Sequence, residues 1–240
     1  MQIVEVQIAV AKVNKYATPE SGDTLEVVER PNGGLSVVLA DGQTSGHGAK
    51  AVSLMVVRKV IGLLADGVRD GAAARAASDA LFTEKKGKVT STLNIASVDL
   101  HSETIVLTRN NPASIHIFRE GKIDELAEPS SPLGTSRDIR PLITEFAIEP
   151  GLTIIIYTDG LTHAGKRRGQ PMNIGEMVKI ALEDQDPTPQ ELADLLLAHA
   201  FRLDDERPAD DISVVVLKVS PRQGDDVRRM NLRLPIQVKQ

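Results

Sequence analysis

The sequence contains no cysteine and no tryptophan, and aromatic residues make up only 2% of its 240 residues. Without cysteine, the chain has no disulfide, no thiolate metal site and no cysteine nucleophile. Apolar residues nevertheless account for 41% of the chain, which is enough for a full core. That core must be aliphatic because aromatic side chains are so few.

Long hydrophobic runs are also absent, since no apolar stretch approaches the ~20 residues that cross a membrane. No signal peptide is recognisable, and residues 3–12 already alternate apolar and polar side chains as a half-buried strand does. There is no basic excess either, because 28 Lys and Arg stand against 33 Asp and Glu, a net charge of −5. These features predict a cytoplasmic protein with neither a nucleic-acid nor a membrane partner.

The predicted elements are mostly short strands. "TLEVVER" and "LSVVLA" flank the hairpin signal "PNGG", three further strand pairs follow before residue 158, and "ISVVVLKV" ends near 219. Apolar residues at helical spacing predict helices over 48–65 and 71–82, and capping signals at Asn173 and Thr188 predict the starts of two further helices. Two antiparallel sheets, each covered by a helix pair, give an α+β fold, a four-layer α/β/β/α sandwich.

We expect one domain over 1–219, followed by a tail over 220–240. The tail alternates apolar and polar residues at Met230, Leu232, Leu234 and Ile236, which suggests one more strand at a sheet edge or in a dimer. The expected state is therefore a monomer or a homodimer.

Four aspartates stand at the ends of apolar strands, namely Asp23, Asp41, Asp159 and Asp210. If they meet, two carboxylates ~5 Å apart repel by about 3 kcal/mol at an effective dielectric near 20, so they need cations. Oxygen ligands without cysteine favour Mg²⁺, Mn²⁺ or Ca²⁺ over Zn²⁺, and paired ions ~3.5–4 Å apart suit phosphoryl hydrolysis. Taken singly, each Asp is more often a turn residue, and His47 more often only starts a helix.

The order of motifs "SGD", "DGxxxGHG", "SPLG", "YTDGLTHA" and "DDISVVVLKV" resembles the metal-dependent (PPM, protein phosphatase 2C-like) serine/threonine phosphatases, and within them the SpoIIE-type branch. The resemblance covers residues 1 to about 219. It implies two divalent cations, Mn²⁺ or Mg²⁺, bridged by Asp41. It also assigns the following residues: metal ligands Asp23, Asp41, Gly42 (through its carbonyl), Asp159 and Asp210; catalytic residues Asp41, Asp159 and Asp210; substrate-binding residues Gly46, His47 and Gly48; and a supporting residue, Asp211.

The implied reaction is hydrolysis of phosphoserine or phosphothreonine on a bacterial signalling protein by metal-activated water. The chain starts directly with a strand and carries "ADGxxSG" at residues 40–46, which is similar to the RsbX-like feedback phosphatases of stressosome signalling. That similarity implies phosphorylated STAS-domain proteins of a stressosome-like complex as partners. Two alternatives remain, a catalytically weak module that binds phosphorylated signalling proteins and a structural sandwich that binds no metal.

One departure from the group concerns proton delivery. Eukaryotic members place a histidine just after "DG", where this chain has Gln43. A proton for the leaving group would then come from His47 or from a metal-bound water.

Overall fold

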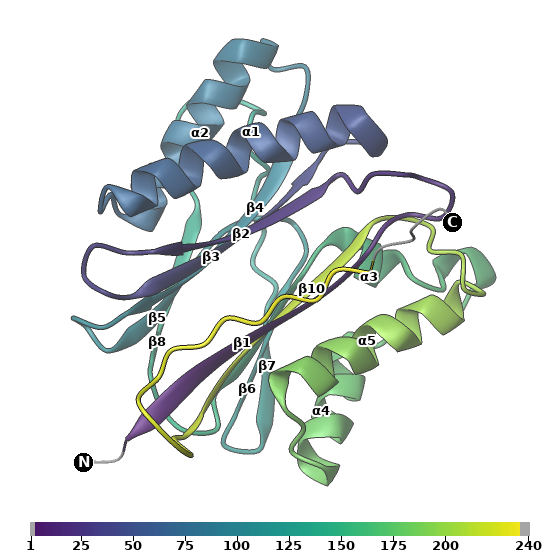
Figure 1. Cartoon of the computed structure of the whole chain (residues 1–240). Coiled ribbons are helices and arrows are strands. Elements are labelled where there is room, and N and C mark those ends of the chain that lie inside the picture. The colour runs from purple at the N-terminus through teal and green to yellow at the C-terminus, as the bar shows by residue number, and fades with distance from the viewer. Residues whose placement is uncertain (1–2, 236–240) are drawn as a thin grey trace, which may run out of the picture.

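Two five-stranded antiparallel sheets packed face to face form the centre of the computed structural model, which describes residues 3–235 (Figure 1). The first sheet has the strand order β2-β3-β4-β5-β8 and the second the order β1-β10-β9-β6-β7. The strands of the first sheet are β2 (Asp23–Glu29), β3 (Leu35–Gly42), β4 (Ser91–Asp99), β5 (Thr104–Asn110) and β8 (Leu142–Ala147). Those of the second are β1 (Val4–Val13), β6 (Ile115–Arg119), β7 (Lys122–Leu126), β9 (Thr153–Tyr157) and β10 (Ile212–Pro221).

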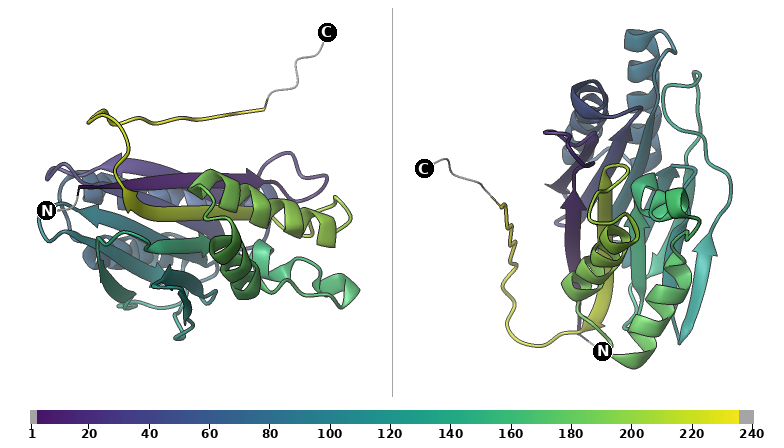
Figure 2. Two further views of the ribbon diagram at one scale, coloured as in Figure 1. Left: turned by 90° about the horizontal axis from the view of Figure 1, so that it is seen from below. Right: turned by 90° about the vertical axis from the view of Figure 1, so that its right-hand side faces the viewer.

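A helix pair covers the outer face of each sheet (Figures 1 and 2). On the first sheet lie α1 (Gly46–Ala65) and α2 (Asp70–Lys85), and on the second α4 (Ile174–Asp184) and α5 (Pro189–Leu203). The predicted caps form, because Asn173 accepts the Glu176 backbone N–H, and Thr188 forms a complete capping box with Pro at the start of the helix. The predicted α+β sandwich of four layers is confirmed.

The core has three apolar layers, one between the sheets and one under each helix pair. Alternate residues of the central strands serve different layers, as when Val38 packs under α1 while Val37 and Leu39 face the other sheet. Among the largest fully buried side chains, Tyr157 is aromatic and the others are Leu or Ile. The core is therefore aliphatic, as the composition requires.

The directions of the strands place the predicted aspartates of both sheets at the same end of the sandwich. In the first sheet β2 begins where β3 ends, so Asp23 pairs with Asp41 in register. In the second sheet β9 ends where β10 begins, so Tyr157 pairs with Val214. Thr158, just after β9, donates a hydrogen bond to the Asp23 carboxylate at 3.0 Å, which places the two ends side by side.

The chain leaves the sandwich after β10. Residues 222–235 form no strand within this single chain, and their backbone stands apart from the sandwich (Figure 2). Arg228 nevertheless reaches back to the β2–β3 hairpin, where it donates to Glu29 Oε1 and to the Gly33 carbonyl, each at 2.9 Å. Met230, Leu232 and Leu234 are exposed, and Leu232 most of all at 97%. The additional strand expected here is thus not found within the described part of one chain, its pairing with a second copy stays a prediction, and Ile236 lies outside the described residues.

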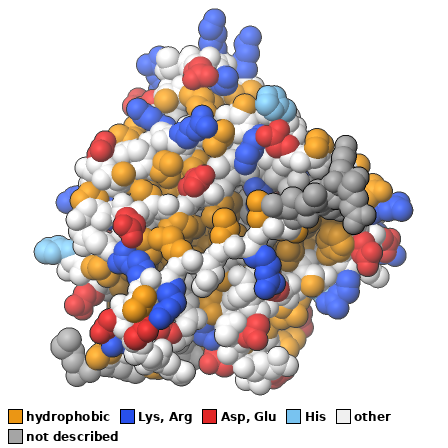
Figure 3. Space-filling view, in the orientation of Figure 1, with side chains coloured by type: hydrophobic (Ala, Val, Ile, Leu, Met, Phe, Trp, Pro, Cys, Tyr) orange, Lys and Arg blue, Asp and Glu red, His pale blue; other side chains and the backbone are white. Residues whose placement is uncertain are grey.

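The face that carries the free edge strands β1 and β2 has apolar side chains near its centre and charges of both signs scattered around them (Figure 3). This mixture agrees with the small net charge. Within residues 3–235, none of the helices is both long enough and apolar enough to span a bilayer.

Candidate metal centre

Asp23 and Asp41 form the half of the site that the first sheet supplies. They are directly opposite each other on neighbouring antiparallel strands, a position in which Cβ atoms are ~4.5–5.5 Å apart. Asp23 is fully buried, whereas Asp41 is partly exposed at the end of its strand. The sheet thus presents two carboxylates at one end with only one of them open to solvent.

The second sheet supplies Asp159 and Asp210. Asp159 is the first residue of the short helix α3 (Asp159–His163) after β9, and Asp210 lies two residues before β10. Gly160 is required beside Asp159, because a Cβ there would lie 2.0 Å from the Asp211 carbonyl oxygen. The glycine of this Asp-Gly pair is therefore required by packing as well as by the turn.

Two hydroxyl groups of the second sheet hold the Asp23 carboxylate. Thr158 Oγ1 donates at 3.0 Å and Ser213 Oγ at 2.6 Å, both to Oδ2 of Asp23. The other oxygen, Oδ1, is buried and has no hydrogen-bond partner among the described residues. A buried carboxylate oxygen without a donor is costly, and a cation is a partner that would relieve it.

Burial raises the pKa of Asp23 to about 6, although the hydroxyls of Ser213 and Thr158 and the nearby Lys12 act in the opposite direction. The pKa of Asp41 rises further, to about 9, because of burial first and then the carboxylates of Asp23, Asp159, Asp210 and Asp211. Burial is also the main cause that raises the pKa of Asp210. Asp23, Asp159 and Asp210 are thus close enough to Asp41 to oppose its ionisation.

Two lysines lie behind the carboxylates. The Nζ atoms of Lys12 and Lys50 donate to the backbone carbonyl of Asp23 at 2.7 and 2.8 Å, and Lys50 also donates to Thr24 Oγ1 at 3.0 Å. Burial lowers the pKa of Lys12, with Asp23 as the main opposing influence. Neither lysine was predicted from the sequence, since both lie in elements that are recognised by their apolar pattern.

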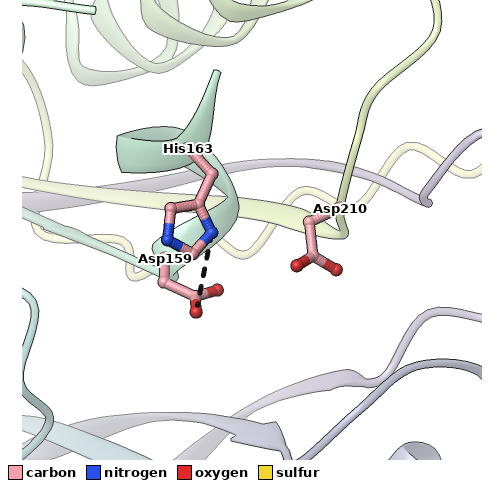
Figure 4. A group of neighbouring side chains, drawn as sticks. All are labelled: Asp159, His163 and Asp210. Carbon is pink, nitrogen blue, oxygen red and sulfur yellow. Dashed lines mark ion pairs between the residues drawn. The ribbon is translucent and has the colours of Figure 1, made fainter. Parts of the chain in front are cut away.

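Asp159, Asp210 and His163 form the open side of the site (Figure 4). Each offers one ligand atom, and these atoms lie within 4.8 Å of one another. Nδ1 of His163 is 3.8 Å from Oδ2 of Asp159, one helical turn away. His163 is not among the residues predicted from the sequence, although the i, i+4 spacing in "DGLTH" is a usable signal.

Asp211 has a supporting place. Its two carboxylate oxygens accept the backbone N–H groups of Lys15 at 2.9 Å and Gly22 at 2.8 Å. Both oxygens are therefore used to fix the chain next to β1 and β2, as expected of a residue that shapes the site without binding metal.

Gly42 is pinned against α1. A Cβ at this position would lie 2.0 Å from the Ala49 carbonyl oxygen, so only glycine fits between β3 and the first turns of the helix. Its assignment as a carbonyl ligand stays a prediction.

The predicted substrate-binding residues lie at the start of α1. Gly46 has a positive φ of +72°, and Gly48 has open space around its Cα. The His47 side chain is 92% exposed, and its Nδ1 lies 3.2 Å from Oε2 of Glu20. His47 is therefore directed to solvent and to Glu20, which favours a structural role for the side chain.

The raised pKa values predict how pH acts on the protein without divalent cations. A carboxyl group whose pKa rises from 3.8 to about 9 on folding keeps its proton longer in the folded state, so stability falls as pH rises through that window. Asp23 adds to this loss of stability between pH 3.8 and about pH 6. In EDTA, we expect the melting temperature to decrease from pH 6 to pH 9, and Asp41→Asn to flatten that decrease. Parallel curves for the two proteins would contradict it.

Comparison with known proteins identifies relatives over most of the chain. The family described as "Stage II sporulation protein E (SpoIIE)" matches residues 31–220. Stage II sporulation protein E of Priestia megaterium is 23% identical over 214 residues, which cover 89% of this chain and 36% of that protein. The chain thus spans about a third of the length of this curated relative.

Solved structures show the same fold. The PP2C phosphatase domain of SpoIIE from Bacillus subtilis, with a fragment of its regulatory domain, matches with a TM-score of 0.78 at 21% identity, over 93% of this chain and 66% of that one. The catalytic domain of the phosphatase PstP in complex with two manganese ions matches with 0.70 at 18% identity, over 91% and 100%. RsbX in complex with magnesium matches with 0.67 at 17% identity, over 92% and 100%.

Proposed function

The chain belongs to the family of stage II sporulation protein E, and we propose that it is a metal-dependent protein serine/threonine phosphatase. One observation carries the proposal: the fold gathers carboxylates from both sheets at one end, where burial and mutual repulsion raise the pKa of Asp41 to about 9. Such a cluster is poorly suited to stand without cations. PstP and RsbX, which share the fold, are seen with manganese and magnesium respectively.

The residues present fit a pair of Mn²⁺ or Mg²⁺ ions. Asp23, Asp41, Asp159 and Asp210 would hold them, with the Gly42 carbonyl and with Oδ1 of Asp23 as the buried oxygen in need of a partner. Ions of this kind supply an activated water and neutralise charge on a phosphate. His163 stands beside Asp159 as a further group on the open side.

The chain's own contribution is positioning. Thr158 and Ser213 hold Asp23 in one orientation across the two sheets, and Lys12 and Lys50 fix the backbone at the same residue. Ser45, the residue before α1, makes no side-chain cap, so the first N–H groups of this 20-residue helix remain suited to a phosphate oxygen. The proposed substrate-binding residues Gly46, His47 and Gly48 would act there through their backbone.

Hydrolysis of a small phosphomonoester such as p-nitrophenyl phosphate tests the proposal. We expect turnover with Mn²⁺ or Mg²⁺ and none in EDTA. Binding of a phosphoprotein without any turnover would instead favour the alternative of a catalytically weak binding module. Absence of both metal binding and turnover would leave a structural sandwich.

The finer proposal is that the substrate is a phosphorylated STAS-domain protein of a stressosome-like complex in the cytoplasm. The similarity of fold to RsbX supports it, as does the segment 127–140 beside the site. This segment is tied down, because Arg109 donates to the Glu128 carbonyl at 2.6 Å and Leu133 pairs with Ser91. Ser91 Oγ in turn donates to the Asp41 carbonyl at 2.8 Å. A fixed loop next to the carboxylates can recognise a folded partner.

We therefore expect an intact phosphorylated STAS domain to be hydrolysed at least ~10-fold faster, in kcat/KM, than a short phosphopeptide with its local sequence, since docking worth about 1.4 kcal/mol gives that factor. The comparison is made at matched Mn²⁺. Equal values would show that no docking surface contributes.

A further inference from the structure

A compact basic loop follows α3 and has no role in the chemistry described so far. Residues 166–168, Lys-Arg-Arg, form a 3₁₀ turn and all three are exposed. Arg168 pairs with Asp205, but neither Lys166 nor Arg167 has an ion-pair partner within residues 3–235. An acidic chain of net charge −5 thus presents two free cationic side chains together.

The loop is held firmly by its own backbone. Gln170 N–H donates to the Gly165 carbonyl at 3.0 Å, and Met172 N–H to the Ala164 carbonyl at 3.3 Å, so the segment closes on itself. Gly165 N–H donates to Asp204 at 2.9 Å, which anchors the loop to the end of α5. Gly165 must be glycine, since its φ is +75° and a Cβ would lie 2.0 Å from the Gln170 carbonyl oxygen. The basic side chains therefore start from a fixed base.

The number of residues between Asp159 and Lys166 limits how far the basic loop can lie from the candidate metal centre. Asp159 starts α3, which ends at His163, and three more residues reach Lys166. Helical residues advance ~1.5 Å and other residues at most ~3.8 Å, so the two Cα atoms are at most ~17 Å apart. An extended substrate peptide covers that distance in about five residues at ~3.3 Å each. Fewer residues are needed where the lysine or arginine side chain extends toward the peptide.

We propose that Lys166 and Arg167 dock acidic residues of the phosphoprotein, about three to five positions from the phosphorylated residue, while the phosphate lies at the aspartates. This rests on the proposed phosphatase function and deepens it by giving the substrate's flanking sequence. Of the nearby carboxylates, Asp205 pairs with Arg168, and the two oxygens of Asp204 accept the backbone N–H groups of Gly165 and Ala209. Neither carboxylate forms an ion pair with Lys166 or Arg167.

Two phosphoserine peptides test the proposal, one with Glu at positions three to five on either side of the phosphoserine and one with Gln in their place. With the wild-type chain at low salt, we expect kcat/KM to be about three- to tenfold higher for the Glu peptide, mainly through KM, as a few exposed ion pairs provide. The preference should fade at high salt, where such pairs are screened.

The double variant Lys166→Gln/Arg167→Gln should lose the preference while it hydrolyses p-nitrophenyl phosphate normally. Arg119→Gln/Lys122→Gln is the matched control, because it removes the same charge at the β6–β7 turn, at the other end of the second sheet. Anisotropy of labelled peptides with serine in place of phosphoserine should give the same ranking without turnover.

Equal kcat/KM for the two peptides, or equal losses in both double variants, would overturn the docking role while the phosphatase function stands. A lack of p-nitrophenyl phosphate hydrolysis with any metal would instead contradict the phosphatase function. In that case equal anisotropy for the acidic and neutral peptides would reject the docking role as well, and a preference for the acidic peptide would support it.

Discussion

Asp41→Asn should reduce metal-dependent phosphate hydrolysis by ~10³-fold or more while the fold remains intact. Asp41 is surrounded by four other carboxylates whose charges raise its pKa, so it is the residue best placed to share cations with all of them. Its loss removes several kcal/mol of transition-state stabilisation, and each ~1.4 kcal/mol is tenfold in rate. Asp159→Asn should behave alike because Asp159 contributes from the opposite sheet. The measurement is kcat/KM on p-nitrophenyl phosphate across a Mn²⁺ titration.

The control for these variants is Asp124→Asn, an exposed aspartate on β7 outside the site. It should retain full activity. Without metal, Asp41→Asn should melt at the same or a higher temperature than the wild type, because one repelling carboxylate is gone. Activity that survives in both Asp41→Asn and Asp159→Asn at saturating Mn²⁺ would refute the assignment of the site.

Gly42→Ala should destabilise the chain by about 3 kcal/mol or more, or prevent folding, although it adds one methyl group. The new Cβ would lie 2.0 Å from the carbonyl oxygen and 2.9 Å from the Cα of Ala49, both backbone atoms of α1. The helix would have to shift off β3, and overpacking against backbone is at the severe end of single substitutions. The measurement is the free energy of unfolding in urea.

Gly48→Ala serves as the matched variant, six residues further along the chain. Nothing lies within 4 Å of its added Cβ, and alanine favours a helix over glycine by about 1 kcal/mol. Its stability should therefore be unchanged or higher. Equal free energies of unfolding for Gly42→Ala and Gly48→Ala would show that the close contact between β3 and α1 does not require glycine at position 42.

The fold could be predicted because its signals are local. The short apolar runs "LSVVLA" and "ISVVVLKV", the helical spacing after Gly48 and the capping box at Thr188 each specify an element from a few neighbouring residues. Two covered antiparallel sheets then follow from the number and order of elements. The tail differs because alternation alone specifies no partner strand, and Met230, Leu232 and Leu234 are exposed in the single chain.

The site could be predicted only in part. Asp-Gly pairs at strand ends marked Asp41 and Asp159, but their meeting depends on strand order, which local patterns do not contain. The residues that hold Asp23 in place could not be predicted for the same reason. Ser213 binds Asp23 across 190 residues of sequence, and Lys12 reaches the Asp23 carbonyl from a different sheet. His163 was missed although it shares a helix turn with Asp159.

Calorimetric titration of Mn²⁺ into the metal-free chain tests the central claim most directly, because the carboxylate cluster is proposed to exist for cations. We expect two Mn²⁺ ions per chain, tighter binding as pH rises toward the pKa of about 9 at Asp41, and loss of binding in Asp41→Asn. Hydrolysis of p-nitrophenyl phosphate should appear over the same range of Mn²⁺. A chain that binds no Mn²⁺, or an Asp41→Asn variant that binds it as the wild type does, would contradict the account.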